Sequence, residues 1–459
     1  MTAGWWPVVW AFFIGTGLGG LAVVLLVATG WLSFFCKRGI LCLATKVHDE
    51  PQQVHLSWAG PPDSTLAITW VTRSANNPDT IQFRPYGQEK WQEASGRSTA
   101  VPRSGLLPSP GRIHRVLLEG LAADTAYEYR VSSDRGAFRP WGEIRRTKTA
   151  PSRGPFTAAF IADTGQTGRI DGLADGVTEV LRSLHAERPL FILGGGDYAY
   201  ANRDGRFADP NLAIDNWFRM MESVISEIPF VAQYGNHECR LSERLRLWKG
   251  RFANPPGPEG SDCYSFDIGG VHFTSLFADG ENKLEANLLA WLDQDLGAAR
   301  ERGAEWLIVF QHESIYGMGS SHPARGEARD VLAPIFVRHK IDLHLSAHDQ
   351  NLERTFPLLG DPNNPQVASQ DMKSYAKGTG VIYAKVSPGG KRSEIGRGFS
   401  RLPEEKPAYV AVRDDTAHHY ALISVSEEAL EVRIQAIAPD GRPERTIDRF
   451  RIWRSQTAA

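Results

Sequence analysis

The chain has 459 residues, with 53 acidic and 51 basic side chains and a formal net charge of −2. This length predicts two or three domains. A hydrophobic fraction of 42% and a charged fraction of 23% exclude an intrinsically disordered chain, collagen and a multi-span membrane protein. Four cysteines exclude a disulfide scaffold. The near balance of charge argues against a dedicated nucleic-acid binder, so no nucleic-acid partner is expected.

Residues 1–48 are predicted to form a single transmembrane helix with a juxtamembrane segment. Residues 1–36 carry no charged side chain, and about 20 apolar residues are enough to cross a bilayer core as a helix. A cleaved signal peptide is the alternative, but the sequence shows no clear basic start or short apolar region. Lys37 and Arg38 follow the apolar run, and the positive-inside rule alone would keep the rest of the chain in the cytoplasm.

Residues 49–150 are predicted to form a small antiparallel β-sandwich. Short apolar runs are separated by Pro, Gly, Asn and Asp, which is the pattern of strands joined by turns. The tail of this region, from His114 to Val131, resembles the end of a fibronectin type III domain. The predicted strands are Val54–Trp58, Leu66–Val71, Thr80–Arg84, His114–Leu118 and Tyr127–Val131.

Residues 151–459 are predicted to form an α/β domain, because strand-like and helix-like segments alternate. Gly269 and Gly270 separate two apolar runs and predict a β-hairpin. The predicted strands are Phe156–Ala162, Leu190–Leu193, Phe230–Tyr234, Tyr264–Ile268, Val271–Phe277, Trp306–Gln311, Ile341–Ser346, Ala421–Val425 and Leu430–Ala436. The predicted helices are Ile170–Glu187, Asn211–Glu227, Leu284–Arg302 and Arg329–His339.

Polar side chains follow the predicted strands of the α/β region, where open sheets place their sites. Each of these residues alone is weak evidence of a functional site, because an Asp after a strand is often a helix cap and Gly-Asn is a common turn. Together, carboxylates, an amide oxygen, a phenol and imidazoles suit two adjacent M²⁺/M³⁺ ions, which activate water and hold a phosphate for attack. These residues are Asp163, Asp197, Tyr200, Asn236, His237, His312 and His348.

The order and context of these motifs resemble the calcineurin-like metallophosphoesterases. The purple acid phosphatase branch is the nearer match, because Tyr200 stands three residues after Asp197 and a fibronectin-like region precedes the motifs. The resemblance covers Asp49 to the C-terminus. It implies an α/β fold, a four-layer β-sandwich flanked by helices, preceded by the small all-β sandwich. It also implies hydrolysis of a phosphate ester by a metal-activated hydroxide.

The resemblance also assigns roles to individual residues. Asp163 and the tyrosinate of Tyr200 would hold the first metal, Fe³⁺, and Asp197 would bridge the two metals. His237 would contact phosphate and act as general acid. His322, ten residues after His312, would face the substrate, although an ordinary loop histidine is the alternative. The ligands of the second metal, which would be Zn²⁺, Mn²⁺ or Fe²⁺, are Asn236, His312 and His348.

Gln350 is a departure from the family pattern. The last motif of the family is Gly-His-x-His, and this chain has Ala347-His348-Asp349-Gln350, so Gln350 replaces the remaining ligand of the first metal. An amide oxygen is a weaker donor than imidazole, so the first site is expected to hold its metal less tightly. Asp349, Glu353 or water are alternative donors there. A non-catalytic binding or adhesion protein and a mononuclear or non-iron phosphodiesterase therefore remain as alternatives to the enzyme.

Cellular context and disulfide pairing stay open at the level of sequence. The resemblance favours an extracytoplasmic catalytic domain, whereas Lys37 and Arg38 favour the opposite orientation. Cys239 and Cys263 either form a disulfide or remain two thiols. The expected partners are a phosphate ester and, through the N-terminal helix, a membrane.

Overall fold

The structure, a computed structural model, describes residues 50–73, 77–103, 111–132, 141–165, 176–202, 209–239, 245–259, 261–277, 284–391, 401–437 and 445–454. The predicted transmembrane helix falls in residues 1–48 and lies outside the described residues. Within the described ranges, every helix is too short or too polar to span a bilayer.

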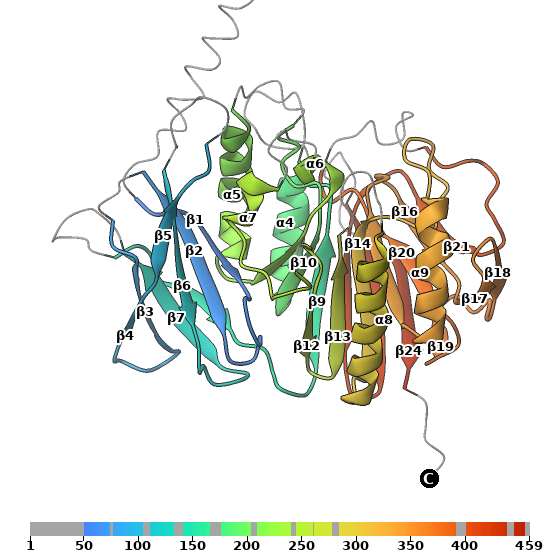
Figure 1. The fold of residues 1–459 in the computed structure, drawn as a ribbon, viewed down its shortest axis with the longest axis horizontal. Helices are drawn as coiled ribbons and strands as arrows, with labels where there is room; N and C mark the ends of the chain where they lie inside the picture. The colour runs from blue at the N-terminus through green and yellow to red at the C-terminus, as the bar shows by residue number, and fades with distance from the viewer. Residues whose placement is uncertain are drawn as a thin grey trace, which may run out of the picture.

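The N-terminal part of the chain is a β-sandwich of two four-stranded antiparallel sheets, as expected (Figure 1). Its core contains Leu56, Ile68, Trp70, Ile81 and Tyr129. One sheet has the order β1 (Gln52–Ser57), β2 (Leu66–Thr72), β6 (Arg112–Leu118) and β5 (Arg97–Ala100). The other has the order β4 (Gln92–Ser95), β3 (Thr80–Pro85), β7 (Ala126–Val131) and β8 (Arg145–Lys148).

The second part contains two seven-stranded mixed sheets. The first has the order β11 (Phe230–Gln233), β10 (Phe191–Gly195), β9 (Phe156–Ile161), β22 (His418–Val425), β23 (Ala429–Ile437), β24 (Arg445–Trp453) and β19 (Ser374–Ala376). The second has the order β12 (Tyr264–Ile268), β13 (Val271–Leu276), β14 (Trp306–Glu313), β15 (Leu343–Ala347), β20 (Ile382–Lys385), β16 (Leu352–Thr355) and β21 (Val410–Asp414). A separate hairpin joins β17 (Leu358–Asp361) to β18 (Asn364–Val367).

The two large sheets pack face to face. Alternate side chains of each strand point to opposite sides of its sheet, so one side of each sheet faces the other sheet. On β9, Phe156 and Phe160 enter the same apolar core as Phe273 and Phe310 of the second sheet. The opposite side of β9, at Ala159 and elsewhere, belongs to the core that contains the helices. The result is four layers, as expected, with helices outside both sheets (Figure 1). The longer helices are α4 (Val177–Ala186), α5 (Pro210–Ile225), α8 (Ala286–Glu301) and α9 (Gly326–Arg338), and the short ones are α6 (Asn236–Cys239) and α7 (Arg246–Lys249).

The N-terminal sandwich packs firmly against the four-layer part. The backbone N–H of Gln53 donates to Glu222 of α5 at 2.7 Å, and Tyr129 donates to the Ser226 carbonyl at 2.6 Å. The ring of Trp58 lies 5.2 Å from that of Phe191 on β10. Hydrogen bonds and an aromatic contact therefore fix the sandwich to the first large sheet and its helix α5.

Several details differ from the sequence-based expectations. The predicted helix over Ile170–Glu187 is described only from Val177 to Ala186, since residues 166–175 lie outside the described ranges. Cys239 and Cys263 are not joined in a disulfide, so that alternative is wrong. The Cys263 thiol accepts the N–H of Phe277 at 3.0 Å and is buried.

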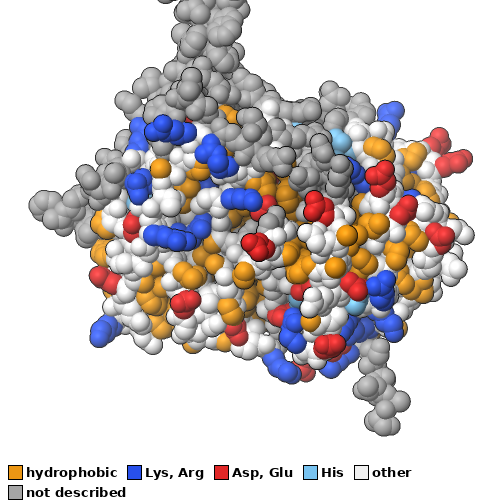
Figure 2. Space-filling view, viewed as in Figure 1, with side chains coloured by type: hydrophobic (Ala, Val, Ile, Leu, Met, Phe, Trp, Pro, Cys, Tyr) orange, Lys and Arg blue, Asp and Glu red, His pale blue; other side chains and the backbone are white. Residues whose placement is uncertain are grey.

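On the face shown in Figure 2, acidic and basic side chains are interspersed, with several Lys and Arg side chains over the N-terminal sandwich. This mixed surface matches the small net charge of −2.

Candidate metal centre

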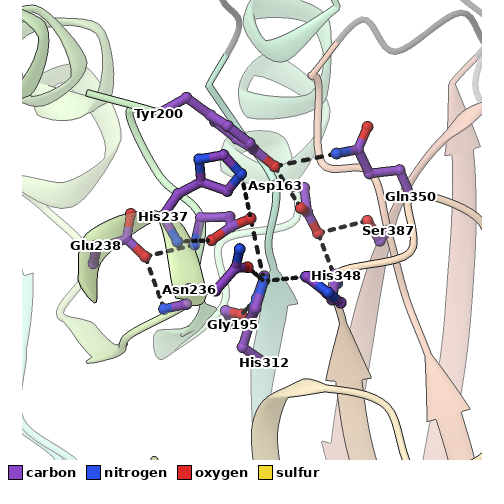
Figure 3. A network of polar contacts seen from close by, with 12 residues as sticks. Asp163, Gly195, Tyr200, Asn236, His237, Glu238, His312, His348, Gln350 and Ser387 are labelled. Carbon is purple, nitrogen blue, oxygen red and sulfur yellow. Dashed lines mark hydrogen bonds and ion pairs between the residues drawn. The ribbon is translucent and has the colours of Figure 1, made fainter. Parts of the chain in front are cut away.

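The candidate site lies where the carboxyl ends of strands from both large sheets meet. Strands β9, β10 and β11 run parallel, as do β14 and β15, so the segments after them lie at the same edge. Figure 3 shows that these segments direct their polar side chains toward one another. The site residues on them are Asp163 after β9, Asp197 and Tyr200 after β10, Asn236 and His237 after β11, His312 on β14, and His348 and Gln350 after β15.

The backbone around the site is strained at four of the predicted ligands. Asp163, Asp197, Tyr200 and His348 have φ values of 52°, 55°, 50° and 75°, in the left-handed region that non-glycine residues rarely adopt. Each such residue costs about 1–3 kcal/mol, and this strain is typical of functional sites. The surrounding fold therefore bears an energetic cost to aim these side chains inward.

The three expected ligands of the second metal form one cluster with Asp197, the expected bridging residue. Asp197, His312 and His348 each offer a ligand atom, and these atoms lie within 4.8 Å of one another. The His312 Nε2 atom lies 3.2 Å from Asp197 Oδ2, 3.1 Å from Asn236 Oδ1 and 3.1 Å from His348 Nδ1. The other ring nitrogen, Nδ1, lies 2.7 Å from the Gly195 carbonyl and fixes the ring. This oxygen and nitrogen donor set fits a divalent transition metal.

Asn236 is oriented for such a role. Its Oδ1 atom faces His312, while its buried Nδ2 atom has no hydrogen-bond partner among the described residues. The contact with His312 thus directs the amide oxygen toward the cluster, and this oxygen is the amide atom that binds a metal.

The first-metal residues Asp163, Tyr200 and Gln350 form an adjoining group. Tyr200 donates its hydroxyl to Asp163 Oδ1 at 2.7 Å. The other carboxylate oxygen accepts from Ser387 Oγ at 2.7 Å and from the His348 N–H at 3.1 Å. Gln350 Nε2 donates to the Tyr200 oxygen at 3.2 Å, and its buried Oε1 atom has no hydrogen-bond partner among the described residues. A metal-binding Gln350 would need its amide rotated so that this orphaned oxygen faces Tyr200.

The two predicted substrate-facing histidines border the cluster. The His237 ring lies 4.1 Å from the Tyr200 ring, and its Nδ1 atom is 2.7 Å from Asn202 Oδ1. The His237 N–H donates to Asp197 Oδ1 at 2.9 Å. The His322 ring lies 4.2 Å from that of His348. One histidine thus lies beside the first-metal group and the other beside the second.

Burial and mutual charge perturb the pKa of several titratable groups here. Burial alone would raise the pKa of Asp197, but His312 and His237 hold it well below its usual range. Burial would lower the pKa of His312, but Asp197 raises it to about 10. Burial, reinforced by His312, keeps the pKa of His348 well below its usual range. Burial and the charge of Asp197 raise the pKa of Asp163, despite an opposing effect of His312. Such perturbed pKa values are typical of functional sites.

Sequence reasoning missed three residues that support the site. Glu238 is fully buried and accepts the N–H groups of Asp197, Tyr198 and Gly235 at 2.7–2.9 Å. Ser387 binds Asp163, and Lys391 Nζ lies 3.8 Å from the centre of the Tyr200 ring. Only Glu238 had a sequence signal, its place directly after His237.

Asp349 and Glu353 were, with water, the alternative donors for the position of Gln350, and the contacts of these two side chains lie elsewhere. Both carboxylates pair with the buried Lys385 ammonium instead. They also accept backbone N–H groups from the segment 318–322. Their oxygens are therefore committed away from the Tyr200–Asp163 pair.

Comparison with known proteins places this geometry in a family. Residues 156–351 match the calcineurin-like phosphoesterases, and residues 51–149 match the N-terminal domain of purple acid phosphatases. The chain is 24% identical over 384 residues to purple acid phosphatase 18 of Arabidopsis thaliana, covering 82% of this chain and 79% of that protein. It is 28% identical over 382 residues to mouse acid phosphatase type 7, covering 77% of this chain and 82% of that protein. The solved structure of the yellow lupin purple acid phosphatase PPD1 superposes with a TM-score of 0.71 at 17% identity, covering 88% of this chain and 74% of that one, which shows a shared fold.

The fold and the catalytic-region match define a calcineurin-like phosphoesterase, a class of hydrolases that act on phosphate esters. With the N-terminal match, the chain belongs to the purple acid phosphatase-like branch of that class. The resemblance inferred from the motifs is confirmed at this level.

Proposed function

We propose that this protein hydrolyses phosphate esters at a binuclear metal centre. The observation that carries the proposal is the convergence of Asp163, Asp197 and Tyr200 with Asn236, His312 and His348 at one edge of the two sheets (Figure 3). The purple acid phosphatases and acid phosphatases among its relatives support it.

The donor groups divide between two metal positions. The second metal would be held by Asp197, Asn236, His312 and His348, and the first by Asp163, Asp197, Tyr200 and the Gln350 amide. Fe³⁺ at the first position with Zn²⁺, Mn²⁺ or Fe²⁺ at the second suits the harder and softer donor sets. When bound, such ions would lower the pKa of a shared water to give a nucleophilic hydroxide and would neutralise the phosphate.

The two histidines at the border of the cluster would supply a proton and a contact to the phosphate. His237 is oriented by Asn202 and by its own N–H bond to Asp197, and its Nε2 atom lies 3.9 Å from Asp197 Oδ2. In the proposed reaction it protonates the leaving oxygen. His322 lies on the opposite side, against His348, and would contact a phosphate oxygen.

A second candidate rests on Gln350. Its amide nitrogen faces Tyr200 and its oxygen is turned away, which would leave the first position short of a ligand. A mononuclear or non-iron phosphodiesterase, or a non-catalytic binding protein with a degenerate centre, would then be the function.

Metal analysis together with hydrolysis separates these functions. We expect two metals per chain and hydrolysis of 4-nitrophenyl phosphate, with Asp197→Asn lowering both. His237→Ala should lower kcat about 100-fold for an alkyl phosphate, and much less for 4-nitrophenyl phosphate, because nitrophenolate leaves without protonation. His185→Ala, a surface histidine paired with Glu227, is the matched control. A folded chain that binds no metal, or unchanged hydrolysis by Asp197→Asn, would rule out the proposal.

Membrane attachment is a separate part of the proposal. The uncharged run at residues 1–36 supports a single N-terminal anchor, and we place the catalytic part outside the cytoplasm. Protease treatment of intact cells should then degrade residues 50–454. Protection in intact cells with degradation after permeabilisation would reverse the orientation, and recovery of the chain in the soluble fraction would exclude the anchor.

A further inference from the structure

We infer that Asp349, with Lys385 and Glu353, is a positioning residue that holds the segment 317–322, and with it His322, against the metal centre. This inference rests on the proposed function only for what His322 does with phosphate. The contacts that fix the segment do not depend on catalysis.

The three charged side chains form a buried cluster beside the site. Their side chains are at most 4% exposed. Lys385, at the end of β20, places Nζ 3.1 Å from Asp349 Oδ2 and also contacts Glu353 Oε1 on β16. A buried ion pair adds little net stability, because desolvation offsets the attraction. Stability alone therefore does not explain why the chain keeps this cluster.

The cluster holds one more negative charge than positive, and the segment 317–322 satisfies the excess. The Met318 N–H donates to both Glu353 oxygens, at 2.9 and 3.1 Å. The His322 N–H donates to Asp349 Oδ1 at 3.3 Å. Two backbone amides, one at each end of the segment, thus compensate the two carboxylates.

Two glycines show how closely the segment runs over the cluster. A Cβ atom added at Gly319 would lie 1.4 Å from Asp349 Oδ2, and one added at Gly317 would lie 3.0 Å from Lys385 Nζ. Only a residue without a side chain fits at Gly319. The path of the segment is therefore set by direct contact with the charged groups.

Asp349 connects this anchor to the metal centre, because it follows His348 directly in the chain. The His322 ring lies 4.2 Å from the His348 ring. Asp349 thus fixes the backbone of His322 relative to the neighbouring His348. Loss of the anchor should loosen His322 while His348 keeps its metal.

Two variants test the anchor independently. Asp349→Ala removes the carboxylate, and Gly319→Ala pushes the segment away without changing any charge. Asp215→Ala is the matched control for the first, since Asp215 is buried 2.8 Å from the buried Arg251 in another part of the protein. Gly142→Ala is the control for the second, because its added Cβ would make only ordinary contacts, at 3.5 Å or more. If Asp349→Ala does not fold, Gly319→Ala still decides.

Hydrogen exchange and kinetics are the readouts. In both variants, amide exchange of the peptide spanning residues 315–325 should accelerate, with metal content unchanged. The KM for 4-nitrophenyl phosphate and the Ki for inorganic phosphate should rise about tenfold, more than kcat falls. Exchange no faster than in the controls, or loss of metal in step with the rise in KM, would overturn the inference. Faster exchange in a protein whose wild type hydrolyses nothing would support the anchor and refute the proposed function.

Discussion

The Tyr200 hydroxyl donates to Asp163 Oδ1 at 2.7 Å across 37 positions of the chain. Gln350 donates its amide N–H to the same phenolic oxygen. Both oxygens of this pair are hard donors that suit a trivalent metal. Gln350 is thus placed beside the pair, but with the atom that cannot bind a metal directed at it.

Replacing Gln350 by His should strengthen metal retention at the first position, because imidazole is a stronger donor than an amide. We expect about tenfold slower loss of one metal per chain during dialysis against a chelator. If iron is the metal, a tyrosinate absorption band should also increase. Gln350→Leu, which has no donor, is the control. Equal metal loss from the His and Leu variants would show that position 350 does not face the metal.

The sequence predicted best those elements whose apolar pattern decides their place in the core. Leu66–Val71 was predicted as a strand, and β2 spans Leu66–Thr72 with every residue buried. In contrast, β4 and β5 were missed because Gln92–Ser95 and Arg97–Ala100 are mostly exposed and carry no apolar alternation. Their strand conformation depends on pairing with β3 and β6, which a local pattern does not record.

The same distinction applies to the site. Asp163 and Asp197 could be proposed because each follows a recognisable strand, and strand ends meet in parallel sheets. Ser387 could not, because it binds Asp163 from 224 positions away in the sequence. The orientation of the Gln350 amide, and the engagement of Asp349 by Lys385, depend on the positions of individual atoms. Residue type and spacing do not encode these.

His272 should make stability depend on pH. Its buried ring lies 2.7 Å from Asp267 and 2.9 Å from Asp295. Burial lowers the pKa of His272, but the hydrogen bonds to both carboxylates outweigh burial and raise it above its ordinary value. Burial would raise the pKa of Asp267, but His272 lowers it.

Because the folded-state pKa of His272 is raised, its stabilisation is complete below the unfolded-state pKa of about 6.5 and is lost as pH rises through the folded value. The contribution of Asp267 is lost at the acid end, as pH falls through its lowered pKa. The free energy of unfolding of His272→Gln should therefore fall below wild type by more at about pH 6 than at about pH 9. Denaturant titrations at both pH values measure this difference. The effect stays modest because the Asp267 side chain is 54% exposed and solvent screens it. A difference that does not change with pH would contradict the prediction.

Phe191 should be important for stability, since it joins the N-terminal sandwich to the core between the large sheets. It is fully buried on β10, and its ring contacts Trp58 at 5.2 Å and Phe273 at 5.4 Å. Phe191→Ala should lower the free energy of unfolding by about 3–5 kcal/mol. Leu117→Ala, at a position 42% exposed, should change it by about 0.5 kcal/mol or less. Similar unfolding midpoints for the two variants would show that this contact is not part of the core.

Glu238 should support the metal centre through the backbone. It is fully buried, and its two oxygens accept the N–H groups of Asp197 at 2.8 Å, Gly235 at 2.7 Å and Tyr198 at 2.9 Å. Asp197 has a φ of 55°, a strained conformation that these hydrogen bonds help to maintain. Burial, reinforced by Asp197, raises the pKa of Glu238 to about 8. The hydrogen bonds from the Tyr198 and Gly235 N–H groups oppose this rise in pKa.

Glu238→Gln keeps the shape but exchanges one acceptor oxygen for an NH₂ group, which would face a backbone donor. The unpaired donors should cost about 1–3 kcal/mol of unfolding free energy, and release of the Asp197 backbone should weaken metal binding about 10- to 100-fold. Glu222→Gln is the matched control, because Glu222 also accepts a backbone N–H, from Gln53, but lies away from the site. Denaturant unfolding and metal titration measure the two effects. A variant that loses stability like Glu222→Gln but binds metal like wild type would show that Glu238 only stabilises the fold and does not position Asp197.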